Sequence, residues 1–488
     1  MEREELAKIR EEKLNKLEAK GLNPFRNKFP LPCSLRCLSE QFEKFQGKVV
    51  KVAGRIMSVR EHGKSAFMDI QDKDAKVQVY FKIDTIGEES YDVMKLLDIG
   101  DHIGVSGEVQ KTRTGEVTIV AKELIPLTKC LRPLPQQWYG LQDVEIRYRQ
   151  RYLDLVMNPE ARDIFLLRSK IITSMRNFLN KHDFIEVETP MMQPLPGGAL
   201  AKPFITHHNA LDIDLYLRIA PELYLKKLIV GGYEKIYELN RNFRNEGVST
   251  RHNPEFTMME LYWAYADYEI LMEFTEQMFN ELVREVKGKE ELVYQSQTIS
   301  FPKKWERITY AEAFKKYCGI DIQPACCEAG RKDSEAQIKQ EAKKRGVDAD
   351  DSFWRVLDSL FKKFAIPNFI QPIFVVDFPI ELSPLAKEKN AGIVERFQPF
   401  VGGLELGNAY SELNDPREQE RRFTKQAEMR DKGDEEAHPL DRDFITALEF
   451  GMPPTAGLGI GIDRLVMLLT DVKSIRDVIL FPLLRPEA

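Results

Sequence analysis

Hydrophobic and polar residues alternate through residues 47–130 in short runs that favour β-strands. Turn residues such as Gly63 and Asp72 separate the runs. The runs cover Val49–Val59, Ala66–Gln71, Val77–Phe81, His102–Val109 and Glu116–Leu124. A helix-like segment, Glu88–Leu97, falls between the third and the fourth run. The pattern therefore predicts five strands with one helix inserted after the third.

This order of strands and helix is typical of an OB-fold barrel, a fold that frequently binds single-stranded nucleic acid. Phe67 offers a ring for stacking on a base, Gln78 an amide for a base edge, and Arg60 a charge for phosphate. Arg55 adds a second charge. Barrels also serve as plain scaffolds, and strand alternation leaves open that Phe67 packs inside the barrel. Nucleic-acid binding is therefore a hypothesis for this segment.

The part of the chain that follows the predicted barrel opens with a helical pattern, which strands follow. Apolar residues at helical spacing predict a long helix, and they are Ile164, Leu167, Ile171, Met175 and Phe178. Residues 184–190 then favour a strand that ends in proline. Residues 237–246 and 251–262 favour two strands joined by a charged loop, because glycine and Asn-Pro interrupt the strand-forming residues.

Two segments near the end of the chain complete this pattern. Residues 402–415 alternate as a strand does. Residues 457–465 carry three glycines spaced Gly-x-Gly-x-Gly, without a hydrophobic strand before them, which differs from a dinucleotide-binding turn. We expect these glycines to open a helix and let it pack closely, with Arg464 directed at a phosphate.

Two charged segments have no assigned chemistry. Residues 1–20 predict a helix of mixed charge with a loose apolar stripe, which either packs on its neighbour or contacts RNA. The basic residues that keep the second option open are Lys13, Lys16, Lys20, Arg26 and Lys28. Residues 328–350 are polar and helix-prone, and we expect them to form a surface insertion.

Composition limits the classes of protein to be considered. A chain of 488 residues is too long for one core, so two or three domains are expected. The net charge is −6, so any contact with nucleic acid must use local basic patches. No apolar run is long enough to span a membrane and the first helix is charged, which indicates a cytoplasmic protein without a membrane partner.

Cysteine and histidine spacing argues against two kinds of metal protein. The six cysteines contain no Cys-x-x-Cys pair, and they lie at positions 33, 37, 130, 318, 326 and 327. We expect reduced, partly buried thiols rather than a zinc site or a disulfide framework. No His-Glu-x-x-His motif is present, so a zinc hydrolase is unsupported.

The charged loop between the two long strands carries the most specific chemistry. Arg244, Glu246, Arg251 and His252 form a fork of cations and hydrogen-bonding groups that suits a polyphosphate attached to a purine. Phe-Arg-Asn-Glu at 243–246 and Asn-Pro-Glu-Phe at 253–256 resemble motif 2 of class II aminoacyl-tRNA synthetases. The flanking residues 220–226 and 259–262 resemble lysyl-tRNA synthetases in particular. The helix and strand up to residue 190 resemble motif 1, and residues 457–465 resemble motif 3.

This resemblance implies an α+β protein with an N-terminal OB-fold barrel and a class II catalytic domain, whose mixed, mainly antiparallel sheet is flanked by helices. The implied limits are 1–45 for a helical extension, 46–132 for an anticodon-binding barrel, 133–150 for a linker and 151–488 for the catalytic domain, with an insertion at about 320–365. It also implies a homodimer that activates L-lysine with ATP and transfers it to the 3′ end of lysine tRNA.

The resemblance also implies roles for individual residues. Arg244 and Arg464 would be catalytic, Phe256 would stack on adenine, and Glu405 would bind Mg2+ between the phosphates. The ATP-binding residues would be Arg244, Glu246, Arg251, His252, Phe256, Glu405 and Arg464. The lysine-binding residues would be Gly198, Glu222, Arg244, Glu260, Tyr262, Asn408, Tyr410 and Glu412. The central anticodon base would be recognised by Phe67 and Gln78, with Arg60 nearby.

Two features of the implied site follow from its charges. Glu222, Glu260 and Glu412 supply negative charge, which suits a cationic substrate because an unpaired buried ammonium is costly. The second feature is a departure from the family pattern: Gln398 stands where a second metal-binding glutamate is usual. An amide provides an oxygen without charge, so we expect an accessory magnesium ion to bind weakly there while the Glu405 site is retained.

Two other functions stay open at this point. One is a lysyltransferase that acts on a protein, although such relatives resemble the catalytic domain alone. The other is a non-catalytic RNA-binding paralogue, which would be expected to lose the phosphate-binding arginines.

Overall fold

The structure is a computed structural model, and it describes residues 3–30, 32–135, 141–322, 331–349, 352–390, 392–431 and 439–486. The chain divides into two compact units, Met1–Tyr139 and Gly140–Ala488, which are described separately. In the part that the structure describes, no helix is both long and apolar enough to span a bilayer.

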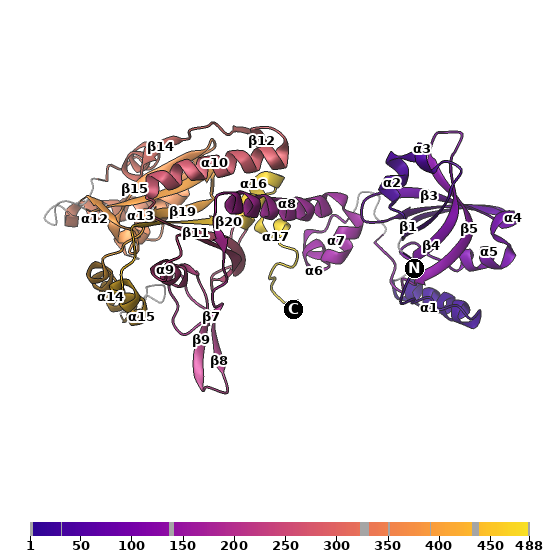
Figure 1. The fold of residues 1–488 in the computed structure, drawn as a ribbon, viewed down its shortest axis with the longest axis horizontal. Coiled ribbons are helices and arrows are strands. Elements are labelled where there is room, and N and C mark those ends of the chain that lie inside the picture. The colour runs from indigo at the N-terminus through magenta and orange to yellow at the C-terminus, as the bar shows by residue number, and fades with distance from the viewer. Residues whose placement is uncertain are drawn as a thin grey trace. The chain divides into compact units, whose positions relative to one another are not determined.

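The N-terminal unit is a closed barrel (Figure 1), and the five predicted strands are confirmed. Its strands pair in the order β1-β2-β3-β5-β4 expected of an OB-fold. They span Val49–His62 (β1), Ser65–Gln71 (β2), Lys76–Lys82 (β3), His102–Lys111 (β4) and Val117–Thr128 (β5). The predicted helix is α5, Glu88–Lys95. The other helices are α1 (Arg3–Ala19), α2 (Leu35–Glu40), α3 (Phe42–Phe45) and α4 (Ile83–Ile86).

Strand alternation in β2 decides the orientation of Phe67. Ala66, Met68 and Ile70 are fully buried in the barrel core. Phe67 lies between them in sequence and therefore faces outward. Its ring centroid lies 4.6 Å from that of Tyr80 on the neighbouring strand β3. The interpretation of Phe67 as a core residue is therefore wrong.

Helix α1 packs within the N-terminal unit. Leu17 is fully buried, and the guanidinium of Arg10 donates hydrogen bonds to the carbonyl oxygens of Cys130 and Ile99, both at 2.8 Å. Lys13 forms an ion pair with Asp98 at 2.6 Å. The packing interpretation of this helix is supported, and Lys13 is already engaged by a carboxylate of its own unit.

The C-terminal unit is built on a mixed, mainly antiparallel sheet, as predicted. Its described strands follow the order β14-β15-β17-β19-β20-β11-β10-β6, with β16 and β18 paired to β17. Only the β10–β6 and β14–β15 pairs among them are parallel. The strands are β6 (Ile185–Glu186), β10 (Lys235–Phe243), β11 (Glu255–Ala264), β14 (Glu306–Thr309), β15 (Ile373–Pro379), β16 (Glu388–Asn390), β17 (Ile393–Val401), β18 (Leu404–Glu405), β19 (Gly407–Ser411) and β20 (Thr455–Gly461).

Smaller elements surround this sheet. One small sheet contains β7 (Met192–Gln193), β8 (Ile205–His208) and β9 (Ile213–Leu217). A second small sheet contains β12 (Glu291–Tyr294) and β13 (Gln297–Ser300). The α-helices are α6 (Val144–Arg149), α7 (Arg151–Met157), α8 (Pro159–Lys181), α9 (Glu222–Val230), α10 (Tyr268–Lys287), α11 (Tyr310–Ala313), α12 (Arg331–Lys344), α13 (Phe353–Phe364), α14 (Pro416–Asp431), α15 (Arg442–Glu449), α16 (Ile462–Thr470) and α17 (Ile475–Val478). Short helical turns cover Phe314–Cys318, Ile366–Asn368 and Ile380–Leu382.

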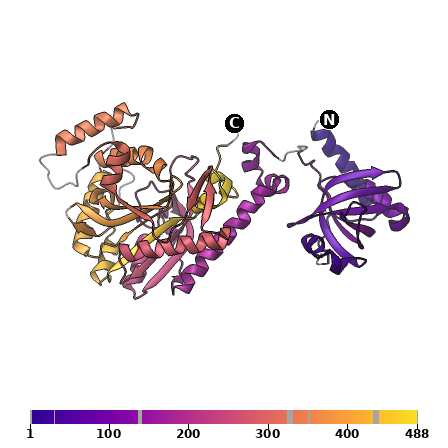
Figure 2. The same ribbon diagram turned by 90° about the horizontal axis from the view of Figure 1, so that it is seen from above.

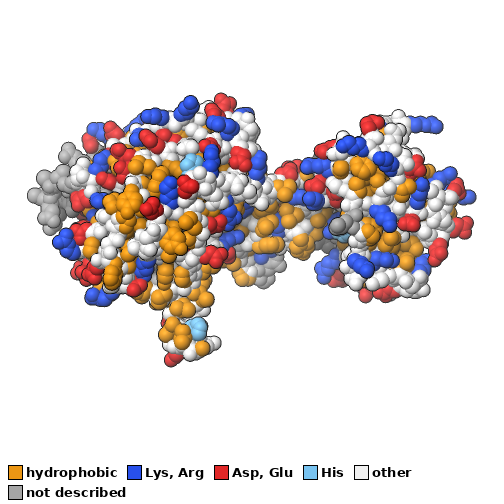
Figure 3. Space-filling model, in the orientation of Figure 1, with side chains coloured by type: hydrophobic (Ala, Val, Ile, Leu, Met, Phe, Trp, Pro, Cys, Tyr) orange, Lys and Arg blue, Asp and Glu red, His pale blue; other side chains and the backbone are white. Residues whose placement is uncertain are grey.

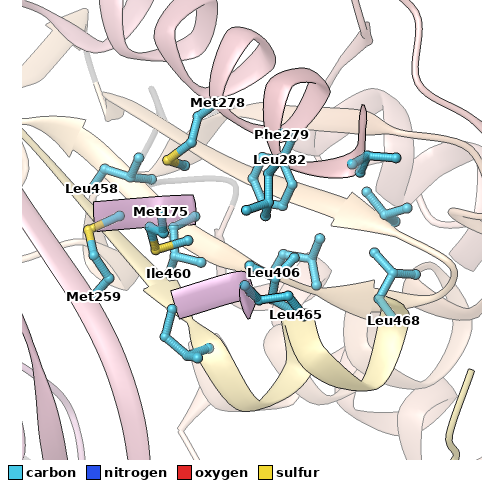
Figure 4. Packing of buried hydrophobic residues seen from close by; sticks show 14 of the residues in the cluster. Met175, Met259, Met278, Phe279, Leu282, Leu406, Leu458, Ile460, Leu465 and Leu468 are labelled. Atoms are coloured by element: carbon cyan, nitrogen blue, oxygen red, sulfur yellow. The ribbon is translucent and has the colours of Figure 1, made fainter. Parts of the chain in front are cut away.

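One face of the sheet is covered by α8, α10 and α16 (Figure 1, Figure 2). Met175 from α8, Phe279 from α10 and Leu465 from α16 pack against Met259 and Leu458 of the sheet (Figure 4). Because side chains alternate along a strand, residues 258, 260 and 262 of β11 and 457, 459 and 461 of β20 face the other way. That second face forms the floor of a cavity.

Three expectations need correction. The predicted strand at 184–190 is reduced to the two residues of β6, and Gly457 and Gly459 lie inside strand β20, whereas Gly461 ends that strand and is the N-cap of α16, as expected for a helix start. The predicted surface insertion is not confined to the surface, because Ile338 and Ala342 of α12 are buried, as are residues of α13 such as Leu360. Because α12 is mostly polar, the sequence of this segment does not make its buried apolar face evident.

The prediction of free thiols is confirmed for the described cysteines. Cys33, Cys37 and Cys130 are partly buried and Cys318 is buried, all without a disulfide. Cys326 and Cys327 lie outside the described residues, as do residues 323–330 and 350–351 of the predicted insertion.

Candidate functional site

A cavity of about 540 Å³ opens on the second face of the C-terminal sheet. It is formed chiefly by β11, β19 and β20 together with the loop that joins β10 to β11. The predicted residues of the catalytic domain all line it, and they are Gly198, Glu222, Arg244, Glu246, Arg251, His252, Phe256, Glu260, Tyr262, Gln398, Glu405, Asn408, Tyr410, Glu412 and Arg464. Residues from widely separated parts of the chain therefore meet in one pocket.

Arg244 occupies the centre of the cationic side of the cavity. Its guanidinium carbon lies 5.0 Å from the centroid of the Phe256 ring, and its backbone N–H donates to the carbonyl of Pro254 at 2.8 Å. Burial lowers the pKa of its guanidinium, and its Nε has no hydrogen-bond partner among the described residues. A buried donor without a partner is costly, so this side chain is arranged for an anionic ligand.

His252 and Arg464 form the second cationic group. Nη2 of Arg464 lies 3.4 Å from Nε2 of His252, and Nδ1 of His252 lies 2.9 Å from Oγ of Ser249. Burial and the nearby Arg464 lower the pKa of His252, so its ring is neutral at pH 7. The neutral ring then accepts from Arg464 through Nε2 and donates to Ser249 through Nδ1–H.

The opposite side of the cavity carries the carboxylates. Glu222, Glu260 and Glu412 are at most 5% exposed. The Tyr410 hydroxyl donates to Glu222 at 2.8 Å, and the Tyr262 hydroxyl donates to Oε2 of Glu260 at 3.3 Å. The three acids converge beside Arg244, as the sequence predicts from their charge.

Burial controls the protonation of these acids. Burial raises the pKa of Glu260 to about 8, and the nearby Glu222 adds to the rise. Burial also raises the pKa of Glu412, and Lys226 is the group that opposes the rise most strongly. Oε1 of Glu412 has no hydrogen-bond partner among the described residues, which leaves it available to a ligand ammonium.

Glycines keep this acidic side open. Gly198 has φ +84, and a Cβ there would lie 2.9 Å from Cβ of Glu222. A Cβ at Gly457 would collide with Glu412 and with the ring of Tyr262. At Gly457 the missing side chain therefore makes room for Glu412 and Tyr262 on the cavity floor, rather than for close packing of a helix.

Asn408 is held by a neighbouring arginine. Nε of Arg396 donates to Oδ1 of Asn408 at 2.7 Å, while Nη1 of Arg396 donates to Ser383 Oγ and to the Leu382 carbonyl, both at 2.8 Å. With its oxygen occupied, the Asn408 amide presents its NH2 group to the cavity. Such a donor suits a ligand carboxylate.

Glu405 and Gln398 are the candidate metal ligands. Both line the cavity, and Nη1 of Arg464 donates to the Glu405 carbonyl at 3.0 Å. No group of three His, Cys, Asp or Glu side chains within the described ranges is placed to hold a metal. Mg2+ commonly uses one or two carboxylates and completes its shell with phosphates and water. The donor set therefore fits a magnesium ion that is held largely by a bound nucleotide.

Several residues of the site were not predicted from the sequence. Lys226 lies behind Glu222 and Glu412, Arg396 holds Asn408, and Lys362 reaches the cavity from α13. Asp463 accepts from the backbone N–H of Thr257 at 2.7 Å and from Arg168 at 2.6 Å, which ties motif 3 to motif 2 and to helix α8. The four-residue spacing of Glu222 and Lys226 was a signal for the first of these.

The predicted anticodon residues share the outer face of the barrel. Phe67 pairs with Arg60 across β1 and β2, and with Tyr80 across β2 and β3. Gln78 is buried, and its amide bonds to Thr118 at 2.9 Å and Glu116 at 3.2 Å, whereas Arg60 contacts Asp69 at 3.3 Å. Tyr80 adds a second aromatic ring that was not predicted.

Comparison with known proteins covers both units. Residues 143–485 match the family described as tRNA synthetases class II (D, K and N), and residues 50–127 match the family described as OB-fold nucleic acid binding domain. The chain is 52% identical over 487 residues to a lysine–tRNA ligase of Carboxydothermus hydrogenoformans, covering 99% of this chain and 98% of the relative. It is also 52% identical over 487 residues to a lysine–tRNA ligase of Pelotomaculum thermopropionicum, covering 99% and 95% of the two chains.

Proposed function

The chain belongs to the class II lysyl-tRNA synthetases, and on this premise we propose that the cavity residues described above form lysyl-adenylate. The protein activates L-lysine with ATP and transfers it to the 3′ end of lysine tRNA. The observation that carries the proposal is the division of one cavity into an acidic side, around Glu412, and a cationic side, around Arg244. A cationic amino acid and a polyphosphate fit these two sides.

Activation joins the lysine carboxylate to the α-phosphate of ATP. The attacking carboxylate is already ionised at neutral pH, so the reaction needs no general base. Catalysis then depends on holding the two anions together and neutralising the charge that develops, which Arg244 does from its buried position. Pyrophosphate leaves as the carboxylate–phosphorus bond forms.

The nucleotide lies along the cationic side. Phe256 stacks on the adenine, and Glu246 lies close to the nucleotide on the same loop. Arg251, His252 and Arg464 hold the γ-phosphate. A neutral His252 contributes a hydrogen bond rather than a charge, so the two arginines supply the charge at this end.

The lysine substrate lies along the acidic side. Glu412 and Tyr262 bind its ε-ammonium, and the free Oε1 of Glu412 is the acceptor that the ammonium completes. Glu222 binds the α-amino group where Gly198 leaves room, and the Asn408 amide donates to the carboxylate. Tyr410 forms the aromatic wall, and Glu260 adds negative charge beside it once the bound lysine favours its ionised form.

Magnesium belongs to the nucleotide side of this proposal. Glu405 would hold the ion together with the phosphates of ATP, and Gln398 would offer a weak neutral oxygen to a second ion. When bound, the ion neutralises phosphate charge and orients the leaving pyrophosphate.

The barrel recognises the anticodon in this proposal. Phe67 and Tyr80 offer adjacent rings for stacking, Gln78 offers an amide to the central base, and Arg60 contacts the phosphate backbone. Gln78 and Arg60 exchange their present partners, Glu116 and Asp69, for the tRNA.

We also propose a cytoplasmic homodimer that forms through an exposed apolar face. Ile185, Met192 and Ile205 are 52%, 56% and 64% exposed, and Leu211 on the β8–β9 turn is 66% exposed. Apolar side chains lie on the projection formed by β8 and β9, next to histidine and acidic side chains near its end (Figure 3). Exposed large apolar side chains that gather on one part of a surface are typical of an interface, and a second copy is the usual partner.

One experiment separates this function from the two alternatives. Lysine-dependent exchange of pyrophosphate into ATP, followed by charging of lysine tRNA, is expected to succeed in both steps. Exchange without charging would favour a protein-directed lysyltransferase, and failure of both would favour a non-catalytic RNA-binding protein. Similarity over 99% of the chain to lysine–tRNA ligases, barrel included, argues against both alternatives.

A further inference from the structure

Lys226 is a buried cation placed behind the substrate-binding acids. It lies on α9 and is 0% exposed. Its Nζ lies 2.6 Å from Oε1 of Glu222 and 2.5 Å from Oε2 of Glu412. Both carboxylates line the cavity, whereas Lys226 does not. The ammonium therefore acts on the pocket through the carboxylates of these two acids.

Stability alone does not account for this arrangement. Burying an ammonium costs several kcal/mol, and a buried ion pair is often no more stabilising than apolar side chains of the same volume. Apolar neighbours are close at hand, since Nζ lies 5.7 Å from the Tyr410 ring centroid and 5.8 Å from that of Phe444. A methionine would fit such surroundings, so the charge requires another explanation.

The protonation state of Glu412 supplies that explanation. Burial raises the pKa of Glu412, and the ammonium of Lys226 opposes the rise. A protonated Glu412 would need an acceptor for its O–H, and Oε1 has no partner among the described residues. The structure therefore favours an ionised Glu412 whose Oε2 is held by Lys226 and whose Oε1 is left for a ligand.

We propose that Lys226 is a positioning residue for lysine recognition, which keeps Glu412 ionised and fixes the carboxylates of Glu222 and Glu412 in orientation before the substrate arrives. The inference rests on the proposed function, because it assumes that these two acids bind the substrate's amino groups. Without Lys226, two neighbouring buried carboxylates would share a proton, and the substrate would have to expel it. The titratable groups that face this cluster are Glu260, Tyr262 and Tyr410, and the charges of Arg244 and Arg218 act on Glu260 in turn.

The substitution Lys226→Met tests the proposal against Lys227→Met. Lys227 is the next residue of the same helix, and it pairs with Asp443, whose side chain is 85% exposed. Titration calorimetry of lysine binding at pH 7, repeated in buffers of different ionisation enthalpy, gives the number of protons released. Wild type and Lys227→Met are expected to release at most one proton, from Glu260, whose pKa burial raises to about 8.

Lys226→Met is expected to release about one proton more per lysine bound. Its dissociation constant for lysine should rise at least about tenfold, because a carboxyl whose pKa lies one unit above the working pH costs that factor to ionise. Its dissociation constant for ATP should stay within about twofold of wild type. A purely structural role would lower the unfolding temperature without changing the proton count, and that result would overturn the proposal.

Two further measurements keep the test decisive. If Lys226→Met fails to fold, Lys226→Gln replaces it, because its side chain is neutral but still forms hydrogen bonds. Lys226→Gln is expected to release the same additional proton on binding lysine. In the wild-type enzyme, release of more than one proton on binding lysine would mean that Glu412 is already protonated, and it would overturn the proposal without any variant. Absence of lysine-dependent exchange in the wild type would instead refute the proposed function.

Discussion

The Tyr410 hydroxyl lies 2.8 Å from Oε1 of Glu222, and this hydrogen bond joins strand β19 to the first residue of helix α9. Through Lys226, the same carboxylate is linked to Glu412, which follows β19. The acidic side of the cavity is therefore a connected group rather than three independent charges. A change at one member is expected to alter the charge of the others.

The pH dependence of lysine binding should report Glu260. Burial and Glu222 raise the pKa of Glu260 to about 8, so this acid is mostly protonated and neutral at pH 7. A cationic ligand favours the ionised form, so the affinity for lysine should increase as pH rises from 6.5 to 8.5 and then level off. Titration calorimetry across this range measures the effect.

The control for this prediction is Glu260→Gln, which cannot ionise. Its affinity for lysine should be weaker and almost independent of pH over the same interval. A pH dependence equal to that of the wild type would assign the titration to another group.

Gly457→Ala should close the acidic side of the cavity. The added Cβ collides with Glu412 and with the Tyr262 ring, so the ε-ammonium loses its site. We expect the KM for lysine in pyrophosphate exchange to rise by at least about a hundredfold, as for loss of a buried charged contact. Gly247→Ala is the matched control, since Gly247 also lines the cavity but a Cβ there meets nothing within 4 Å.

Phe67→Ala should separate the two steps of the reaction. The side chain faces away from the barrel core, so its removal should leave the unfolding temperature within a few degrees and pyrophosphate exchange unchanged. Charging of lysine tRNA should weaken by about tenfold to a hundredfold, because stacking contributes about 1–3 kcal/mol per base. An unfolded barrel would contradict the outward orientation of the ring.

Gln398→Glu should lower the concentration of Mg2+ that activation requires. A carboxylate in place of the amide adds a charged ligand beside Glu405, so half-maximal exchange is expected at a lower concentration of Mg2+. The measurement is a magnesium titration of exchange at constant ATP. An unchanged curve would show that residue 398 takes no part in metal binding.

Much of the fold and of the candidate site could be predicted from local patterns in the sequence. Alternation in residues 47–130 located the strands of the barrel, since strand periodicity and turn residues act over short distances. The charged blocks around Arg244 and Glu412 marked residues that line one cavity. In both places, neighbouring residues carried enough information.

The remaining features depend on contacts between distant parts of the chain. Strand β20 was not predicted, because its glycines have low strand propensity. Pairing with the neighbouring strands β11 and β19 holds this segment extended. Lys226 has the spacing of an ordinary surface pair with Glu222, and its burial against Glu412 follows from tertiary packing alone. The outward orientation of Phe67 likewise required the register of the barrel.

The central claim is that the acidic side of the cavity selects a cationic amino acid for activation beside Arg244. The most direct test is the KM for lysine in pyrophosphate exchange for the wild type and for Glu412→Gln, with aspartate and asparagine as competing substrates. We predict exchange with lysine alone, and a rise in the lysine KM of at least about a hundredfold in the variant, since an ammonium would lose its charged partner. An unchanged KM in Glu412→Gln, or exchange supported by aspartate, would contradict the account.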